Sequence, residues 1–336
     1  MTLVNNPGTW SAIYWPLEHA AWHGWTPTDL VFPFFLFMVG MTIHLSRKST
    51  FGQALKRAAI LFGLGLFLNA FPFFVLSTWR IPGVLQRIAV CYLVVWMVRR
   101  VAGPAVQAVL AVVLLVGYWL LMTQVPVPGV GAPNLERGTN LAAWIDSVVL
   151  TGHMWSVTKT WDPEGILSTL PAVATTLMGA LAGHWLATPR APQVRAAGLI
   201  GAGLVLTTSG IVWGEAFPIN KSLWTSSFTL LTGGLAAALF GLCYLVVDVW
   251  QYRRGTRPWV VYGTNAILIY VLSSLLSRTL GVTKIGGVSL QAHAFAALLA
   301  PWLPAAAASL VWALGMVAFW YVVLVALDRR GLRFAV

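Results

Sequence analysis

Long apolar runs recur from one end of this sequence to the other, and they constrain its fold more than any other feature. Many are about 20 residues long, which is the length that an α-helix needs to cross a bilayer. Hydrophobic residues make up 58% of the 336 residues and charged residues only 9%, whereas soluble domains carry about 25% charged residues. The mean hydropathy is +0.78. We therefore expect most of the chain to be surrounded by lipid.

The apolar runs predict helices and exclude a barrel. Inside a bilayer every backbone polar group needs an internal partner, which only helices and closed barrels provide. Barrel strands alternate polar and apolar residues over about ten positions, and these runs are continuous. We predict an all-α, polytopic membrane helix bundle with nine full spans, at 28–46, 57–78, 83–98, 104–124, 165–187, 196–214, 224–250, 258–278 and 304–327.

The chain is interpreted as one transmembrane domain, 1–336, because no internal repeat or low-complexity tract divides it. Residues 1–6 resemble the last turn of a further helix, so we expect a first core helix that is truncated at its N-terminal end. Cys91 and Cys243 both lie inside apolar segments, which argues against a disulfide framework and against a cysteine-based zinc site.

The net charge of +12 is concentrated in alternate loops. The clustered loops and the C-terminus hold 14 of the 21 Lys and Arg residues: Arg47, Lys48, Lys56, Arg57, Arg99, Arg100, Arg190, Arg195, Arg253, Arg254, Arg257, Arg329, Arg330 and Arg333. The other loops balance seven basic residues against seven acidic ones. Because cytoplasmic loops carry the Lys and Arg excess, we predict a cytoplasmic C-terminus in a multi-pass inner-membrane protein. The excess charge then indicates topology, and no nucleic-acid partner is expected.

Polar residues collect at the outer ends of the predicted spans, most densely at 18–29. Asp29 lies where a helix begins, and the helix dipole favours a carboxylate there, while Thr26 or Thr28 can cap the same helix. Capping alone would explain Asp29. An ionisable side chain that faces the bundle instead marks a functional site. His19, ten residues earlier, is close enough to pair with Asp29 and act as a general base.

His19 has two other interpretations. As a solvated loop residue it would have no role. His23 follows four residues later, so a helical turn would place both imidazoles on one face, and two histidines beside Asp29 can hold zinc. No further His or Cys lies at ligand spacing in the outer loops, so we expect no metal.

Three further outer corners carry polar groups: Arg80 and Arg87; Asp162 and Glu164; and Asn220, Lys221 and Trp224. Snorkelling to the interface explains Arg80 well and Arg87, one turn inside its helix, less well. Helix capping explains one carboxylate of the 162–164 pair easily and both poorly. Together these residues predict a polar site facing outward, but they do not identify a reaction.

Four sequence blocks resemble the family of heparan-α-glucosaminide N-acetyltransferase and its bacterial homologues. They are HAAWHGWTPTDLVFP at 19–33, RIPGVLQR at 80–87, DPEGIL at 162–167 and NKSLW at 220–224. They occur in the family's order and cover nearly the whole chain. The resemblance implies a membrane N- or O-acetyltransferase. Such an enzyme moves an acetyl group from cytoplasmic acetyl-CoA to an amino sugar or other glycan on the periplasmic side.

The resemblance also implies roles for individual residues. The family's catalytic histidine falls on His19 and its essential aspartate on Asp29. The asparagine that ends the first core helix falls on Asn5, or on Asn6 if the register shifts by one. His19 would deprotonate the acceptor or carry the acetyl group, and Asn5 would donate a hydrogen bond to the developing oxyanion. The residues expected to shape the acceptor pocket are Arg80, Arg87, Asp162, Glu164, Asn220, Lys221 and Trp224.

Two alternatives remain open at this point. An amino-sugar permease would also use a helix bundle with a polar site and broken helices, whereas a purely structural membrane protein would leave the clustered carboxylates unexplained. Lys48, Lys56 and Arg57 are available to grip the phosphates of CoA, but the positive-inside rule explains them equally well. Gly179 and Gly183 form a small-xxx-small pair that permits close helix packing, and a homo-oligomer is possible.

Overall fold

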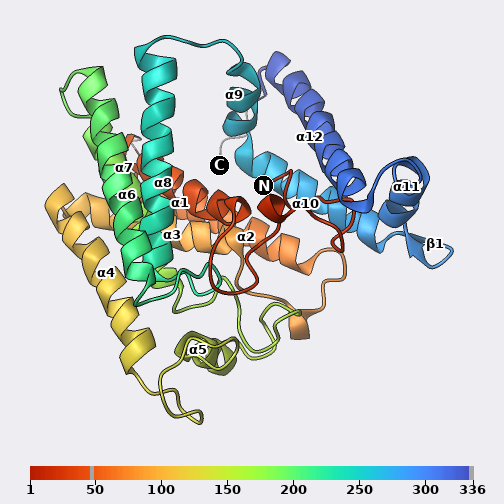
Figure 1. Ribbon diagram of the computed structural model, residues 1–336, viewed down its shortest axis with the longest axis horizontal. Helices are drawn as coiled ribbons and strands as arrows, with labels where there is room; N and C mark the ends of the chain where they lie inside the picture. The colour runs from red at the N-terminus through yellow and green to blue at the C-terminus, as the bar shows by residue number, and fades with distance from the viewer. Residues whose placement is uncertain (46–48, 333–336) are drawn as a thin grey trace.

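The computed structural model describes residues 1–45 and 49–332 and shows the expected all-α bundle (Figure 1). Arg47, Lys48 and Arg333 of the basic clusters lie outside these residues. The α-helices of the described residues are α1 Val31–Leu45, α2 Phe51–Ala70, α3 Val84–Val101, α4 Pro104–Gln124, α5 Leu141–Val149, α6 Thr169–Leu186, α7 Pro192–Gly214, α8 Ser226–Tyr244, α9 Arg257–Thr264, α10 Ala266–Val282, α11 Leu290–Leu298 and α12 Ala305–Arg329.

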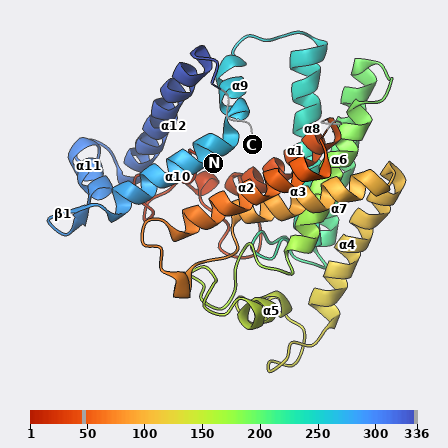
Figure 2. The same ribbon diagram turned by 180° about the vertical axis from the view of Figure 1, so that it is seen from behind.

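Shorter elements complete the described chain. They are the 3₁₀ turns η1 Trp15–Leu17, η2 Pro27–Leu30 and η3 Leu76–Thr78, the π-helical end of α8, η4 Leu245–Val249, and a hairpin of β1 Lys284–Ile285 and β2 Val288–Ser289. Figures 1 and 2 show the same division of the molecule from opposite sides. Helices α10, α11 and α12 and the hairpin lie to one side of the body that α1–α8 form.

Each of the nine predicted spans coincides with a helix or a pair of helices. Six described helices are long and apolar enough to cross a membrane, and α9 with α10 make a seventh if that pair is one span. The other two, α3 and α6, are surrounded mainly by protein. Half or more of their residues are buried, and α3 carries three arginines. A helix shielded from lipid does not need a wholly apolar surface, so α3 and α6 can still cross the membrane. The count of nine spans therefore stays a prediction.

Several predicted boundaries differ from the structure, and α2 begins at Phe51, six residues before the predicted span 57–78. The predicted span 57–78 ends at Ala70, because Pro72 cannot continue a helix and restricts the residue before it. The predicted span 258–278 is broken at Asn265, where α9 and α10 meet at 78°. The predicted outer loops 125–164 and 279–303 contain α5 and α11, each only nine residues long and therefore too short to register as spans.

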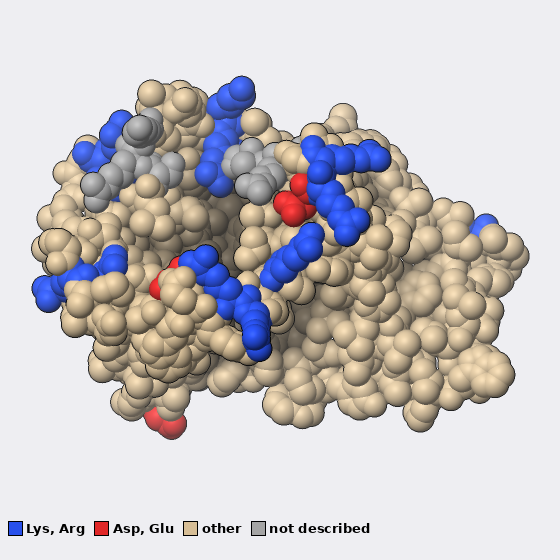
Figure 3. Space-filling view, turned by 90° about the horizontal axis from the view of Figure 1, so that it is seen from above, with Lys and Arg blue, Asp and Glu red and all other residues tan. Residues whose placement is uncertain are grey.

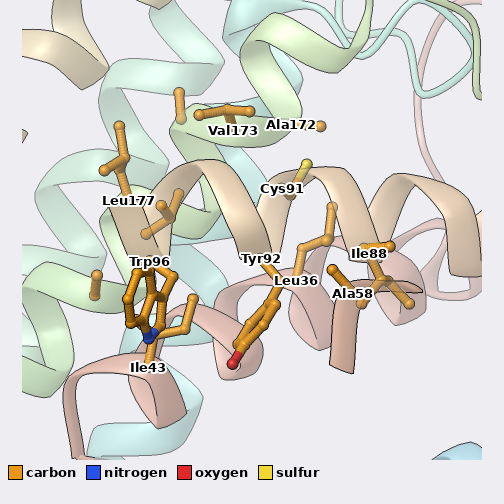
Figure 4. Close-up of a cluster of buried hydrophobic side chains, with 14 of the residues drawn as sticks. Leu36, Ile43, Ala58, Ile88, Cys91, Tyr92, Trp96, Ala172, Val173 and Leu177 are labelled. Atoms are coloured by element: carbon orange, nitrogen blue, oxygen red, sulfur yellow. The ribbon is translucent and has the colours of Figure 1, made fainter. Parts of the chain in front are cut away.

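Small residues let α1 and α6 approach closely at the centre of the bundle. A Cβ atom added at Gly179 would lie 1.9 Å from the carbonyl oxygen of Phe37, and one added at Gly40 would lie 1.9 Å from that of Thr176. Gly183 faces Met41 and His44 in the same way. The small-xxx-small pair of α6 therefore packs helices within the chain. Around it, apolar side chains of α1, α3 and α6 form one buried cluster, to which Leu36, Cys91 and Leu177 belong (Figure 4).

The basic loops share one end of the molecule. The loops between α6 and α7 and between α8 and α9 lie there with the C-terminal end of α12, while α5 and the loops around it lie at the opposite end (Figure 1). Figure 3 shows Lys and Arg side chains around a hollow on the basic face. Loops with the strongest Lys and Arg excess therefore come together in space, as the topology prediction requires.

Candidate active site

A histidine–aspartate pair lies at the start of the first apolar helix. Asp29 belongs to η2 and is only 1% exposed. Its Oδ1 lies 2.6 Å from Nδ1 of His19, whose side chain is 49% exposed. Its Oδ2 accepts hydrogen bonds from the backbone N–H groups of Ala20 and Thr26, at 3.1 and 3.0 Å. The two interpretations of Asp29 therefore both apply, because one oxygen caps the turn and the other holds the imidazole.

The pair fixes which nitrogen of His19 is available for chemistry. An ionised carboxylate can only accept hydrogen bonds, so Nδ1 carries the proton and donates to Asp29. Nε2 then keeps its lone pair. This is the arrangement in which a buried carboxylate orients a histidine for base or nucleophilic catalysis.

Lys221 reaches the same pair from a segment 202 residues away in the chain. Its ammonium lies 3.2 Å from Oδ1 of Asp29, 2.9 Å from Nδ1 of His19 and 3.4 Å from Nε2. Burial lowers the pKa of Lys221, and the charge of Asp29 opposes that shift. The side chain is 24% exposed, so the cation is partly desolvated but still open to the site.

The turn that carries Lys221 is held from both sides. Oδ1 of Asn220 accepts the backbone N–H of Leu223 at 2.9 Å, and Trp224 adopts a positive φ of 52° with its backbone N–H on the carbonyl of Lys221. The backbone N–H of Gly24 donates to the carbonyl of Ile219 at 2.7 Å, which ties this turn to the histidine loop. Asn220 is fully buried and therefore shapes the turn rather than the pocket surface.

A second charged cluster joins Arg80 to the 162–164 carboxylates. The guanidinium donates to both oxygens of Asp162, at 2.8 and 2.6 Å, and to Oε2 of Glu164 at 2.5 Å. Burial opposes ionisation, but the two carboxylates raise the pKa of Arg80 above its usual range. Arg80 also lies over the ring of Trp155. Arg80 is thus an ion-pair residue of the site.

Arg87 lies behind this cluster within the protein. It is 3% exposed, donates to the carbonyl of Gly165 at 3.0 Å and to Oγ of Ser168 at 2.5 Å, and lies over the ring of Trp224. Snorkelling to the membrane interface is therefore wrong for Arg87. It links the loop that follows Asp162 to the wall of the site.

Asp146 of α5 is a structural contributor that the sequence did not single out. It is 2% exposed and accepts the backbone N–H groups of Asp162 and Ile166, at 3.1 and 2.9 Å. Desolvation raises the pKa of Asp146 to about 6. A Cβ at Gly165 would come within 2.0 Å of its Oδ2, so the loop fits around this carboxylate. The available signal was an acid inside the mainly apolar stretch 141–150.

These elements enclose a cavity of about 350 Å³. It is lined by His19, Ala20, Trp22, Asp29, Arg80, Val84, Trp155, Pro163, Glu164, Lys221, Ser222 and Trp224. Of the residues that the sequence proposed for catalysis and substrate binding, six therefore share one cavity: His19, Asp29, Arg80, Glu164, Lys221 and Trp224. Arg87, Asp162 and Asn220 are not part of this described lining and act from behind it.

Asn5 does not lie where its expected catalytic role would require. Its side chain is exposed, and the described lining of the cavity does not include it. The backbone N–H of Asn5 donates to the carbonyl of Met1, so the predicted turn at 1–6 is present. The neighbouring Asn6 is buried and donates to the carbonyl of Thr2. The structure thus shows no contact of Asn5 with His19 among its described hydrogen bonds.

His23 does not join His19. Residues 18–26 are not helical, so the two imidazoles point to different partners, and His23 contacts the side-chain amide of Asn220 at 3.4 Å. Within residues 1–45 and 49–332, no group of three or more His, Cys, Asp or Glu side chains is arranged to hold a metal ion. Trp22 beside it donates to the carbonyl of Leu135 and packs edge-on against Trp161, which closes one wall of the cavity.

Fold and site together define a class: a polytopic helical membrane protein with a carboxylate-oriented histidine in a polar cavity. Comparison with known proteins identifies the family. Residues 11–211 match the family model described as heparan-alpha-glucosaminide N-acetyltransferase, catalytic. That match covers more than half of the chain, and the chain belongs to this family, as the four blocks predicted.

Two curated relatives extend the match beyond the family model. The heparan-alpha-glucosaminide N-acetyltransferase of Homo sapiens is 29% identical over 342 residues, which cover 81% of this chain and 50% of the human protein. That of Mus musculus is 29% identical over 344 residues, covering 83% of this chain and 52% of the mouse protein. The chain thus spans about half the length of the curated relatives that it matches.

Proposed function

We propose that this protein is a membrane acetyltransferase that moves an acetyl group from acetyl-CoA to an amino sugar or other glycan acceptor. The observation that carries the proposal is the contact of 2.6 Å between Nδ1 of His19 and Oδ1 of Asp29 at the wall of a polar cavity. Membership of an acetyltransferase family supports it. The donor would bind from the basic face, and the acceptor cavity would face the periplasm from the inner membrane.

His19 would act through Nε2, either by taking a proton from the acceptor or by carrying the acetyl group between donor and acceptor. Asp29 would hold the productive tautomer and stabilise the imidazolium that forms. The geometry supports both roles, because Asp29 is 1% exposed and contacts Nδ1, while His19, whose side chain is 49% exposed, lines the cavity.

The cavity walls suit an amino sugar. Trp22, Trp155 and Trp224 supply aromatic surface, on which the apolar face of a sugar ring can pack. Glu164 supplies a carboxylate that can accept hydrogen bonds from hydroxyl groups or from an ammonium group. The ion pair with Arg80 fixes the carboxylate of Glu164 in one position. Glu164 would therefore select the acceptor by its orientation as well as by its charge.

A second cavity, of about 310 Å³, suits the acyl donor. Its lining includes Phe35, Met38, Val39 and Thr42 of α1, Arg57 and Leu61 of α2, Ile88 and Tyr92 of α3, and Gly263, Thr264, Ala266 and Ile267 beside the break between α9 and α10. A mainly apolar cavity with one guanidinium fits a pantetheine chain that ends in phosphates. Val84 of α3 lines the acceptor cavity and Ile88 lines this one, so about 6 Å of helix rise separates the two linings.

The test uses purified protein, labelled acetyl-CoA and glucosamine. We expect label transfer that His19→Ala abolishes and that Asp29→Asn lowers by about three to four powers of ten, because the amide no longer fixes the tautomer. His293→Ala, at an exposed histidine of α11, is the matched control and should retain full activity. Transfer that survives His19→Ala would contradict the proposal.

A permease is the second candidate, and one observation favours it. The helix pair α9–α10 is broken, and broken helices commonly line transport sites. Proteoliposomes distinguish the two activities when acetyl-CoA is sealed inside and glucosamine is added outside. Acetylglucosamine should appear without uptake of free glucosamine, whereas uptake without acetylation would identify a permease.

A further inference from the structure

The cavity contains a cation beside the reactive nitrogen, and its place suggests a role beyond acceptor binding. The resemblance assigned stabilisation of the acyl oxygen to Asn5, but Asn5 is exposed and outside the described cavity lining. We propose that Lys221 is a catalytic residue that stabilises the negative charge on the acyl oxygen during transfer at Nε2 of His19. This inference rests on the proposed acetyltransferase function and assigns one step of it.

The distances place the ammonium where that charge develops. Nζ of Lys221 lies 3.4 Å from Nε2 of His19. An acyl carbon attacked by, or bound to, Nε2 carries its oxygen one bond further on. An ammonium group beside Nε2 can therefore reach this oxygen at the roughly 2.7–3.1 Å that effective oxyanion donors show. The three N–H groups of lysine allow one donor for Asp29 and another for the acyl oxygen.

The cation is preorganised. The 220–224 turn is fixed by the hydrogen bond of Asn220 to Leu223, and by that of the Trp224 indole to Oγ1 of Thr175 at 3.1 Å. The contact with Asp29 at 3.2 Å holds the ammonium group itself. Donors that are already in place when charge develops need no reorganisation, which is why such electrostatic terms are large.

The other cation of the described lining is committed elsewhere. Arg80 donates to two carboxylates, those of Asp162 and Glu164, so its charge is already balanced. Lys221 contacts one carboxylate, Asp29, which also accepts from His19. Of the two, Lys221 therefore has the charge and the position to serve a new anion at Nε2.

The step balances without a further reactant. In direct transfer, the acceptor amine attacks the thioester carbon, the new N–C bond forms, and the carbonyl electron pair moves to the oxygen beside Lys221. When the carbonyl re-forms, the C–S bond breaks. His19 takes the proton of the amine at Nε2 and returns it to the thiolate. In the two-step route, Nε2 attacks the thioester carbon, the C–S bond breaks and CoA leaves as a thiolate. The acceptor amine then attacks the acetyl carbon, the new N–C bond forms, the bond to Nε2 breaks, and the amine proton passes to Nε2 and on to the thiolate. Each attack places negative charge on the same acyl oxygen.

The experiment compares Lys221→Met and Lys221→Arg in the full-length protein, with Lys284→Met of the exposed hairpin as the control. We expect Lys221→Met to lower kcat for acetyl transfer by about 100- to 1,000-fold, the usual effect of removing one such donor. The KM for acetyl-CoA and the unfolding temperature should stay close to wild type. Lys221→Arg, which keeps a cation, should recover a large part of kcat. Lys284→Met should be unchanged.

A second assay separates this inference from the proposed function. The ester p-nitrophenyl acetate can acylate a nucleophilic histidine directly, and the rate that His19→Ala removes measures that reaction. Lys221→Met should lower this His19-dependent rate even if wild-type protein transfers nothing from acetyl-CoA, in which case only the proposed function fails.

Two results would overturn the role of Lys221. One is a Lys221→Met protein with wild-type kcat and wild-type ester rate. The other is a variant that raises the KM for the amino sugar at unchanged kcat, which would make Lys221 a binding residue only. If Lys221→Met does not fold, Lys221→Gln, which keeps a polar side chain of similar length, is judged by the same two criteria.

Discussion

At the scale of single residues, the site depends on Asp29, whose two carboxylate oxygens bind different partners. Asp29 could be interpreted from sequence as a cap or as a partner of His19, and the structure shows both, one for each oxygen. The pairing was within reach of sequence because only ten residues separate the two. Lys221 had been assigned to the acceptor, since nothing in a local motif indicates that a residue 202 positions away contacts the histidine.

Asp146 provides a prediction for pH dependence. Its pKa is raised from 3.8 to about 6 in the folded protein. The folded state therefore binds this proton more tightly than the unfolded state, so the stability it confers is complete below about pH 4 and is lost as the pH rises through 6. Relative to Asp146→Asn, which does not titrate, wild type should lose up to about 3 kcal/mol of unfolding free energy over this range.

The measurement is the unfolding of both proteins in detergent at several pH values. Taking the difference between them removes the titration of all other groups. A difference that stays constant between pH 4 and 7 would contradict the burial of an ionisable carboxyl at this position. Glu136→Gln, at an exposed carboxylate of the same outer segment, serves as the control and should show no such change.

At the scale of elements, apolar length and helix breakers explain most of what could be predicted. The spans 104–124 and 196–214 agree with α4 and α7 to within a few residues. An apolar run in lipid must satisfy its own backbone hydrogen bonds, so it forms a helix up to the nearest Pro or Gly. The break at Asn265 was missed because the predicted span 258–278 was drawn through the small and polar residues 263–265, which have apolar residues on both sides. The short helices α5 and α11 were missed because a search for spans does not detect nine-residue helices.

Packing between α1 and α6 gives a prediction at this scale. Gly179→Ala would place a methyl group against the backbone of Phe37, which cannot move without separating the helices. We expect a loss of about 1–3 kcal/mol, as for other overpacked cores. Gly117→Ala in α4, where the added Cβ has no neighbour within 4 Å, should be neutral or slightly stabilising. Thermal unfolding in detergent measures both, and equal effects would show that α1 and α6 do not pack this closely.

At the scale of the whole molecule, the path of the chain explains why the basic loops and the His19 cavity lie at different ends of the bundle. The basic loops gather at one end (Figures 1 and 3). The His19 cavity is lined by residues of the predicted outer loops and of the helix ends beside them. A chain that alternates between the two sides of a membrane must place its even and odd loops on opposite faces. Charge counting along the sequence therefore predicted the sorting of loops that the structure shows.

Cysteine labelling tests the orientation. Ala191→Cys lies in the basic loop between α6 and α7, and Val130→Cys lies in the loop before α5, both at exposed positions in a background with Cys91 and Cys243 replaced by serine. A membrane-impermeant maleimide added to intact spheroplasts should label position 130 and spare position 191 until the membrane is permeabilised. The reverse pattern would mean that the His19 cavity faces the cytoplasm.

By itself, the sequence determined the all-α membrane class, the sorting of loops by charge and the family, because composition and local motifs are properties of neighbouring residues. Only the tertiary structure decided which polar residues form the cavity, that Arg80 is ion-paired with Asp162 and Glu164, that Arg87 is buried against Gly165 and Ser168, and that Lys221 rather than Asn5 lies beside His19. The physical reason is that a buried charge is stable only beside its partners. Those partners come from segments that meet when the bundle packs.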